Sequence, residues 1–310
     1  MSKKIRTLVI LLIALALVAG AGYMALSTLA PELVTPRTAS QQTKAREIKQ
    51  ADTKNIVSEE IHVPHDGIDL YGYLVAPANY KSIHLPLIIM SHGYNSNADI
   101  VSKFATLAAQ RGYMVYAFDF YGGGYSTRSG NTDMLDMSVL TEKADLNAVL
   151  DYWKAQHFVD TSHIYLGGIS HGGLISTLVA ADRPNDVKAM VLFAPAFHIT
   201  DLVKKGMQEF GYADISQVPN TVTYHEQTVG KRYITDALGI DIPAAERAYT
   251  GPVLIIHGTA DTIVPFSYSQ SAEKTFPHAQ LMSIEGADHS MSDFVSVGSL
   301  LTLEDFMKKY

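Results

Sequence analysis

The sequence predicts an α/β fold with a mostly parallel sheet that is covered by helices on both faces. Three observations lead to this prediction. From about residue 56 onward, short apolar runs alternate with segments of helical spacing. The runs are continuously apolar, as in strands buried on both faces. The chain has 310 residues, of which 47% are hydrophobic and 18% charged, which is enough for one large core.

The individual elements follow from local patterns. Residues 61–77, "IHVPHDGIDLYGYLVAP", indicate two strands around a turn at Asp66-Gly67. The later strands are expected at 85–93, 113–120, 163–169, 187–195, 252–258 and 279–286. The helices are expected at 99–112, 139–156, 171–182, 266–276 and 293–310. The helix 139–156 has apolar residues at Leu140, Ala144, Leu146, Val149 and Trp153.

One segment interrupts this alternation. About 55 residues, 195–250, separate two expected strands, where a single helix would suffice. The segment is mixed in polarity and rich in Tyr, Phe and Met. Long ordered loops on α/β scaffolds usually carry function, so we expect a lid over a site. A structural insertion that shields an exposed sheet edge is the alternative.

The first 55 residues are expected to lie outside this domain. Residues 1–30 begin with three basic residues and then become apolar, which predicts that the following chain is exported. The sequence "AGA" at 19–21 favours a cleaved signal peptide, but the apolar run is also long enough for a retained membrane anchor. Residues 31–55 are a polar linker, and 56–310 form the main domain. The protein is therefore expected to be extracytoplasmic, either secreted or anchored, with its N-terminal segment interacting with the membrane or the export machinery.

Charge and cysteine content exclude some functions. The formal net charge of −7 disfavours nucleic acid as a partner, because phosphate binding needs a basic surface. The chain has no cysteine, which rules out disulfides and thiolate metal sites.

The main chemical signal is the glycine-rich stretch around Ser170. Residues 168–172, "GISHG", fit the pattern G-x-S-x-G, with an expected strand before the serine and a helix directly after it. Such a strained turn lifts a serine hydroxyl off the sheet. Side chains at Gly168 and Gly172 would collide with the neighbouring strand and helix. We interpret Ser170 as a nucleophile; a plain glycine-rich turn is the alternative.

A serine nucleophile needs a histidine base and an acid that orients it. Asp261 follows the expected strand 252–258, and His289 follows the strand 279–286, in the chain order that this type of site requires. The carboxyl ends of parallel strands meet at one sheet edge, so we expect the three residues to lie together. Singly, Asp261 could be a turn residue and His289 an exposed loop residue. His92 and His257, also at strand ends, are expected to serve in packing.

The site also needs two backbone N–H groups for the negatively charged oxygen of the intermediate. One belongs to the residue after the nucleophile, His171, and the other to the loop after strand 85–93, where Tyr94 is placed to supply it. The expected sites are thus Ser170, Asp261 and His289 as the catalytic residues, with Tyr94 and His171 as the oxyanion hole.

Taken together, the stretches "SHGY", "FDFYGGGYS", "GGISHGG", "HGTADTIVP" and "EGADHS" resemble the α/β-hydrolase superfamily, and more narrowly the bacterial cinnamoyl or feruloyl esterases and lysophospholipase-like hydrolases. The resemblance covers about residues 58–310. It implies a serine hydrolase that cleaves small-molecule carboxylic esters through an acyl-enzyme, without a metal or organic cofactor. A peptidase, thioesterase or acyltransferase on the same residues stays open, as does, less favoured, a non-catalytic binding protein. Histidine at position 171, where many such esterases have glutamine, leaves the substrate class open.

Overall fold

A computed structural model describes residues 51–224, 227–289 and 305–310, which belong to one compact unit, Glu47–Tyr310. The expected leader 1–30 and most of the linker 31–55 lie outside these residues. Within the described ranges, every helix is too short or too polar to cross a bilayer.

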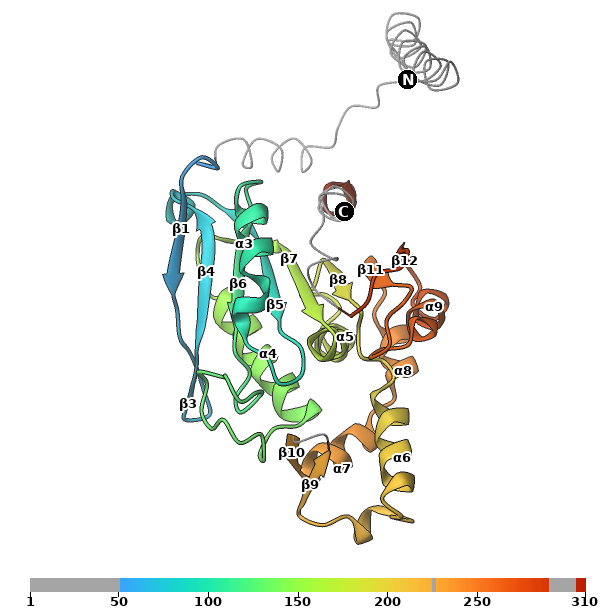
Figure 1. The fold of residues 1–310 in the computed structure, drawn as a ribbon. Helices are drawn as coiled ribbons and strands as arrows, with labels where there is room; N and C mark the ends of the chain where they lie inside the picture. The colour runs from blue at the N-terminus through green and yellow to red at the C-terminus, as the bar shows by residue number, and fades with distance from the viewer. Residues whose placement is uncertain (1–50, 225–226, 290–304) are drawn as a thin grey trace, which may run out of the picture. The chain divides into compact units, whose positions relative to one another are not determined.

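An eight-stranded sheet forms the centre of this unit, with the strand order β1-β4-β6-β5-β7-β8-β11-β12 (Figure 1). Its strands are β1 (Ile56–Glu60), β4 (Gly72–Pro77), β5 (Leu85–Ser91), β6 (Met114–Phe118), β7 (Val159–Ile169), β8 (Ala189–Phe193), β11 (Val253–Gly258) and β12 (Ala279–Ile284). Strand β4 runs antiparallel to β1 and β6, and all other neighbours are parallel. The predicted mostly parallel sheet is confirmed, and its strand ends place the loops after β5, β7, β11 and β12 at one edge.

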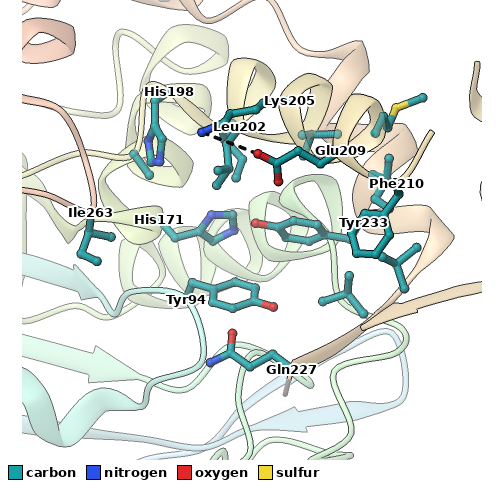
Figure 2. A pocket seen from close by; sticks show the side chains of 18 of the residues that line it. Tyr94, His171, His198, Leu202, Lys205, Glu209, Phe210, Gln227, Tyr233 and Ile263 are labelled. Carbon is teal, nitrogen blue, oxygen red and sulfur yellow. Dashed lines mark ion pairs between the residues drawn. The ribbon is translucent and has the colours of Figure 1, made fainter. Parts of the chain in front are cut away.

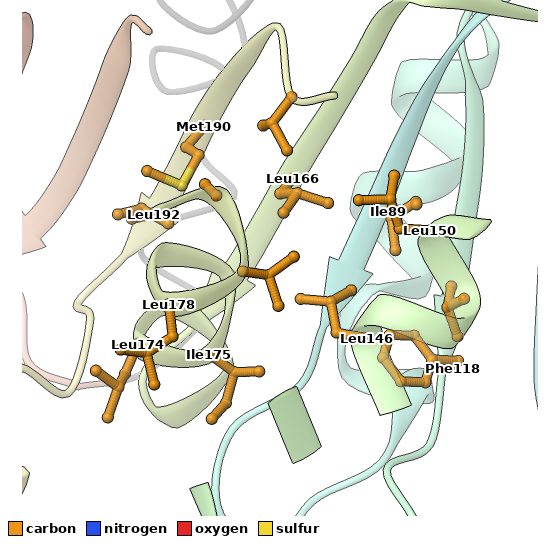
Figure 3. Packing of buried hydrophobic residues seen from close by; sticks show 14 of the residues in the cluster. Ile89, Phe118, Leu146, Leu150, Leu166, Leu174, Ile175, Leu178, Met190 and Leu192 are labelled. Atoms are coloured by element: carbon orange, nitrogen blue, oxygen red, sulfur yellow. The ribbon is translucent and has the colours of Figure 1, made fainter. Parts of the chain in front are cut away.

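Alternate side chains of the strands enter two separate cores. In β5, Leu87 and Ile89 join a large cluster with helices α4 (Val139–Lys154), α5 (His171–Asp182), α8 (Ile242–Ala248) and α9 (Phe266–Thr275). Figure 3 shows part of this cluster, in which α4 and α5 pack on the sheet. The intervening residues of β5, Ile88 and Met90, pack on the other face with α3 (Ser102–Ala109) and with Phe306 and Met307 near the C-terminus. Helices therefore cover both faces, as predicted.

Helix α4 differs from its expected pattern. Its residue Leu140 is 43% exposed, whereas the acidic residues Glu142 and Asp145 are buried together with Leu146 and Trp153. The helix begins at a capping box in which the Ser138 hydroxyl accepts from the Thr141 N–H. The expected helix is confirmed, and of its apolar residues Leu146, Val149 and Trp153 are buried, whereas Leu140 is exposed because the inward face passes through 142 and 145.

Short elements complete the scaffold. The predicted hairpin at 61–77 is present as β2 (Val63–His65) and β3 (Ile68–Leu70), joined by a turn with positive φ at Asp66 and Gly67. The 3₁₀ turns η2 (Tyr80–Ser82) and η3 (Ala98–Val101) lie in the loops around β5. Of the helix expected at 293–310, residues 305–309 are helical, and 293–304 lie outside the described residues.

The long insertion after β8 carries secondary structure of its own. It contains α6 (Ile199–Glu209), η4 (Ile215–Gln217), a hairpin of β9 (Thr221–Tyr224) and β10 (Gln227–Gly230), α7 (Lys231–Gly239) and α8. Hydrogen bonds tie it to the rest of the fold. The Ser138 hydroxyl donates to Asp236 of α7 at 2.6 Å, and Tyr268 of α9 donates to Asp201 of α6 at 2.8 Å. The insertion is thus fixed at both α6 and α7.

Candidate active site

Ser170 lies in the turn between β7 and α5 with a strained backbone. Its φ of 50° and ψ of −114° are rare for a residue with a side chain. A Cβ on Gly172 would lie 2.4 Å from the carbonyl oxygens of Ser91 and His92, and a Cβ on Gly168 would lie 2.3 Å from the Gly172 carbonyl oxygen. Glycine is therefore required on both sides of the serine, which is the geometry that the G-x-S-x-G pattern predicts.

Asp261 and His289 meet at the same sheet edge. His289 Nδ1 lies 2.6 Å from Asp261 Oδ2. Because an ionised carboxylate only accepts hydrogen bonds, Nδ1 carries the proton, which leaves Nε2 free to accept one. The other carboxylate oxygen, Oδ1, accepts from the N–H groups of Ile263 and Val264, each at 2.9 Å. The aspartate therefore fixes both the tautomer and the position of the imidazole.

A second imidazole stabilises the charge of this aspartate. His257 Nε2 lies 3.0 Å from Asp261 Oδ2, and its Nδ1 lies 2.6 Å from the Ser269 hydroxyl. Burial by itself would raise the pKa of Asp261, but hydrogen bonds from His257 and His289 and from the Val264 N–H hold that pKa well below its usual range. His257, expected to serve in packing, thus contacts the acid directly.

The structure brings Asp261 and His289 into direct contact, and it places Ser170 separately in the wall of a cavity. In the described part of the chain, no hydrogen bond joins the Ser170 hydroxyl to His289. Such hydrogen bonds are often long in ligand-free sites and tighten when substrate binds.

The two expected oxyanion donors lie beside Ser170. A Cβ on Gly93 would be 3.5 Å from the Ser170 Cβ, so the loop after β5 passes directly over the serine. Among the described residues, the N–H groups of Tyr94 and His171 have no protein acceptor. His92 holds this loop: its Nδ1 donates to the Gly93 carbonyl at 2.7 Å, and its Nε2 accepts from the Phe120 N–H at 3.0 Å. Burial lowers the pKa of His92, so its ring is neutral.

A cavity of about 500 Å³ opens above Ser170. Figure 2 shows the rings of Tyr94, His171 and Tyr233 gathered in its wall, with centroids 5.7 to 6.2 Å apart. The insertion supplies most of the apolar lining: Ile199, Leu202, Val203, Met207, Phe210, Tyr212, Val222, Val229 and Ile234. The insertion expected to act as a lid therefore forms the wall of the cavity that contains the serine.

Sequence reasoning missed two polar residues at this site. His198, at the start of α6, lines the cavity, and burial followed by the nearby charge of His289 lowers its pKa to about 4. Glu142 of α4 is 1% exposed and lies 2.9 Å from His171 Nε2. The signal for Glu142 was present in the sequence, because position 142 is on the same helix face as Leu146 and Trp153.

Comparison with known proteins places this geometry in a family. A family model described as serine aminopeptidase, S33, matches residues 84–238, half of the chain. A solved structure of Est1E from Butyrivibrio proteoclasticus with ferulic acid bound is 27% identical, with a TM-score of 0.69 over 80% of this chain and 96% of that chain. The bifunctional esterase/perhydrolase DCH of Acinetobacter calcoaceticus is 24% identical over 266 residues, which cover 73% of this chain and 91% of that enzyme.

A further relative is much longer than this chain. The acylamino-acid-releasing enzyme of Sus scrofa is 24% identical over 221 residues, which cover 67% of this chain but 28% of that enzyme. The chain spans about a third of the length of the acylamino-acid-releasing enzymes that it matches. The family match, the sheet and the resemblance to esterases agree: the chain belongs to the serine aminopeptidase S33 family and is a hydrolase with the α/β-hydrolase fold.

Proposed function

We propose that the protein cleaves carboxylic esters of small molecules through an acyl-enzyme on Ser170. The observation that carries this proposal is the strained Ser170 in the wall of a mostly apolar cavity, beside two backbone N–H groups that have no acceptor within the described ranges of the chain. The hydrogen bond between Asp261 and His289 supports it, because that pair presents an unprotonated Nε2 at the same sheet edge.

The proposed reaction has two halves, formation and hydrolysis of the acyl-enzyme, and the same residues act in both. Ser170 Oγ attacks the ester carbonyl while His289 Nε2 takes its proton, and Asp261 stabilises the resulting imidazolium. The N–H groups of Tyr94 and His171 bind the oxyanion. His289 then protonates the departing alcohol, and a water molecule, activated by the same imidazole, releases the acid and restores Ser170.

The charges around the cavity favour an ester over an N-terminal peptide. Recognition of a free substrate amine needs an unpaired carboxylate near the serine. Among the cavity-lining residues that the structure describes, the carboxylate is Glu209, and it lies 3.7 Å from the Lys205 ammonium in the ion pair drawn in Figure 2. Most of the remaining wall is apolar or aromatic, with His198 and Gln227 as further polar members, and such a wall suits a neutral acyl group.

An aromatic acid is the acyl group that we propose first. Est1E binds ferulic acid, and Tyr94 and Tyr233 of this chain place two rings in the cavity wall. The rings of Phe210 and Tyr212 are stacked at 5.9 Å on the insertion side. Such rings offer flat apolar faces to an aromatic substrate. A short aliphatic acyl group, of the kind that general esterases cleave, is the alternative within the same reaction.

Hydrolysis of p-nitrophenyl butyrate and methyl ferulate tests the proposal. The wild type should cleave both, and Ser170→Ala should lower kcat by at least about 10⁴-fold. The matched control is Ser271→Ala on the exposed face of α9, where the hydroxyl bonds only to the Ser267 carbonyl; its rate should equal that of the wild type. Undiminished activity in Ser170→Ala would remove the nucleophile assignment, and cleavage of an aminoacyl amide in preference to both esters would favour a peptidase.

A further inference from the structure

A buried acid–base pair includes His171, the residue that carries one of the two proposed oxyanion donors. The side chains of Glu142 and His171 are 1% and 2% exposed, and Glu142 Oε2 lies 2.9 Å from His171 Nε2. The two groups are close enough for an ion pair, but their angles are not those of a hydrogen bond. Within the described chain, the polar atoms of both side chains therefore have no hydrogen-bond partner. The mechanism above uses only the backbone N–H of His171 and leaves this pair without a role.

Glu142 is a buried carboxyl group near the start of a helix. A buried carboxylate without a counter-charge is strongly unfavourable. Glu142 is in the first turn of α4, where the helix dipole stabilises negative charge. Its neighbour Asp145 lies 3.8 Å from a different imidazole, that of His65, and burial raises the pKa of Asp145 well above its usual value despite a hydrogen bond from the Tyr121 N–H.

His171 is the imidazole in direct contact with Glu142. His92 also lies near Glu142, since a Cβ on Gly123 would touch both side chains, at 3.1 Å and 3.3 Å. However, burial lowers the pKa of His92, and both its ring nitrogens already have backbone partners. The ring of His171 instead faces the carboxylate, with Nε2 2.9 Å from Glu142 Oε2, and an imidazole is a stronger base than a carboxylate.

The position of His171 gives this charge a use. His171 directly follows Ser170 and opens α5, so its ring and its N–H belong to the same turn. Its ring also contacts that of Tyr94, which supplies the other proposed donor, at 6.2 Å between centroids. Helix α5 itself opposes a cation at its N-terminus, so the imidazolium depends on Glu142.

We propose that Glu142 holds His171 as an imidazolium, and that this buried charge stabilises the oxyanion together with the backbone N–H of the same residue. The inference rests on the proposed ester hydrolysis and adds an electrostatic contribution to it. Glu142 acts as a positioning residue. The negative charge of Glu142 lies 2.9 Å from His171 Nε2 and offsets part of the effect, so we expect a net gain in rate of about five- to ten-fold.

Three variants test this pair: Glu142→Gln, His171→Gln, and the double variant. Each is assayed for kcat and KM with p-nitrophenyl butyrate, for the Ki of butylboronic acid, which forms a tetrahedral adduct with a serine nucleophile, and for Tm. The control is His163→Gln, since His163 forms a hydrogen bond with Asp160 at the opposite end of β7. The control should keep the wild-type kcat and Ki.

The expected pattern separates charge from structure. Glu142→Gln should lower kcat about five- to ten-fold and raise the boronate Ki by the same factor, with KM nearly unchanged. His171→Gln should lower Tm the most, because it leaves Glu142 buried without a cation. The double variant should regain Tm but keep the low kcat and the raised Ki.

Two results would overturn the inference. Wild-type kcat and Ki in Glu142→Gln would mean that the pair is neutral, and recovery of kcat together with Tm in the double variant would mean that the pair is structural. Should His171→Gln fail to fold, the other two variants still decide. Failure of the proposed function is distinguishable, because the wild type itself would then neither hydrolyse the ester nor bind the boronate.

Discussion

At Ser170 the backbone occupies a conformation that costs a non-glycine residue about 1–3 kcal/mol. Neighbouring segments hold it in place: the Ser170 N–H donates to the Phe193 carbonyl at 2.8 Å, and the Ser170 carbonyl accepts from the Ala196 N–H at 2.9 Å. Phe193 is the last residue of β8 and Ala196 comes shortly after it. The sheet itself therefore maintains the strained conformation. The result is a side chain that leaves the sheet edge and faces the cavity.

This tight turn predicts that Gly172→Ala is severely damaging. The new methyl group would meet the backbone carbonyls of Ser91 and His92 at 2.4 Å, and backbone cannot move aside cheaply. We expect a loss of about 1–3 kcal/mol in the free energy of unfolding and at least a hundred-fold loss in kcat/KM, measured by urea denaturation and ester hydrolysis. The control is Gly239→Ala at the end of α7, where a Cβ would have nothing within 4 Å. Equal behaviour of the two variants would contradict the close packing of the elbow.

The sequence was sufficient to predict Ser170, Asp261 and His289 as site candidates because each is marked by local signals: a glycine pattern, a strand end and the chain order. The structure adds what such signals do not carry. The contact between Glu142 and His171 depends on how α4 packs against α5, and the place of His198 in the cavity wall depends on how α6 folds over the sheet edge. Helical spacing marks position 142 as inward-facing, but it does not reveal either of these contacts.

At the scale of elements, the insertion was predictable as an anomaly but not as a structure. Its length between two strands indicated a lid, and α6 and α7 are clearly amphipathic, but the way in which these helices and the hairpin fold together does not follow from local pattern. Tertiary contacts define it, such as the hydrogen bond from Ser138 to Asp236 and that from the Thr228 N–H to the Tyr125 hydroxyl. The two strands before and after it, by contrast, were evident as apolar runs.

The packing of α8 against α9 contains a buried acid that makes stability depend on pH. Glu246 is 4% exposed, and burial raises its pKa to about 7, opposed by a hydrogen bond from Thr275 and the charge of Arg247. Between pH 4.5 and 7 the folded state therefore holds a proton that the unfolded state releases. The contribution of Glu246 to the free energy of unfolding is therefore largest at low pH and declines as the pH rises towards 7.

Glu246→Gln should remove this decline. The variant should match the wild type at pH 5 and exceed it by about 2 kcal/mol in the free energy of unfolding at pH 8, since glutamine resembles the protonated acid. Urea denaturation at the two pH values measures the difference. Glu285→Gln, in an exposed turn after β12, is the control and should track the wild type at both. A constant offset between Glu246→Gln and the wild type would contradict the raised pKa.

At the scale of the whole molecule, two hydrophobic clusters, one on each face of the sheet, hold residues from Val63 of β2 through to Met307. These cores, together with the cavity, lie within the compact unit Glu47–Tyr310. The fold class could be predicted from the sequence because the buried strands are continuously apolar. The site edge could be predicted because parallel strands all end on the same side.

Removal of residues 1–50 should therefore leave the catalytic unit intact. We expect the shortened protein to keep Tm within about 2 °C and kcat/KM within about two-fold of the full chain, because the core and the site lie outside the deleted part. Thermal unfolding and ester hydrolysis in detergent compare the two forms. The leader is proposed to direct export or anchor the chain, so only the full chain should be recovered with membranes. Lost activity in the shortened form would mean that the N-terminal segment contributes to the site.

Labelling with a fluorophosphonate, followed by intact-mass and peptide mapping, tests the central claim most directly. The reagent reacts with a serine that is activated by a nearby base. We predict one adduct per chain, located on Ser170, that is absent in Ser170→Ala, at least a hundred-fold slower to form in His289→Ala, and unchanged in the exposed-loop control His157→Ala. An adduct on any other residue, or labelling of His289→Ala at the wild-type rate, would contradict the assignment of Ser170 as a nucleophile activated by His289.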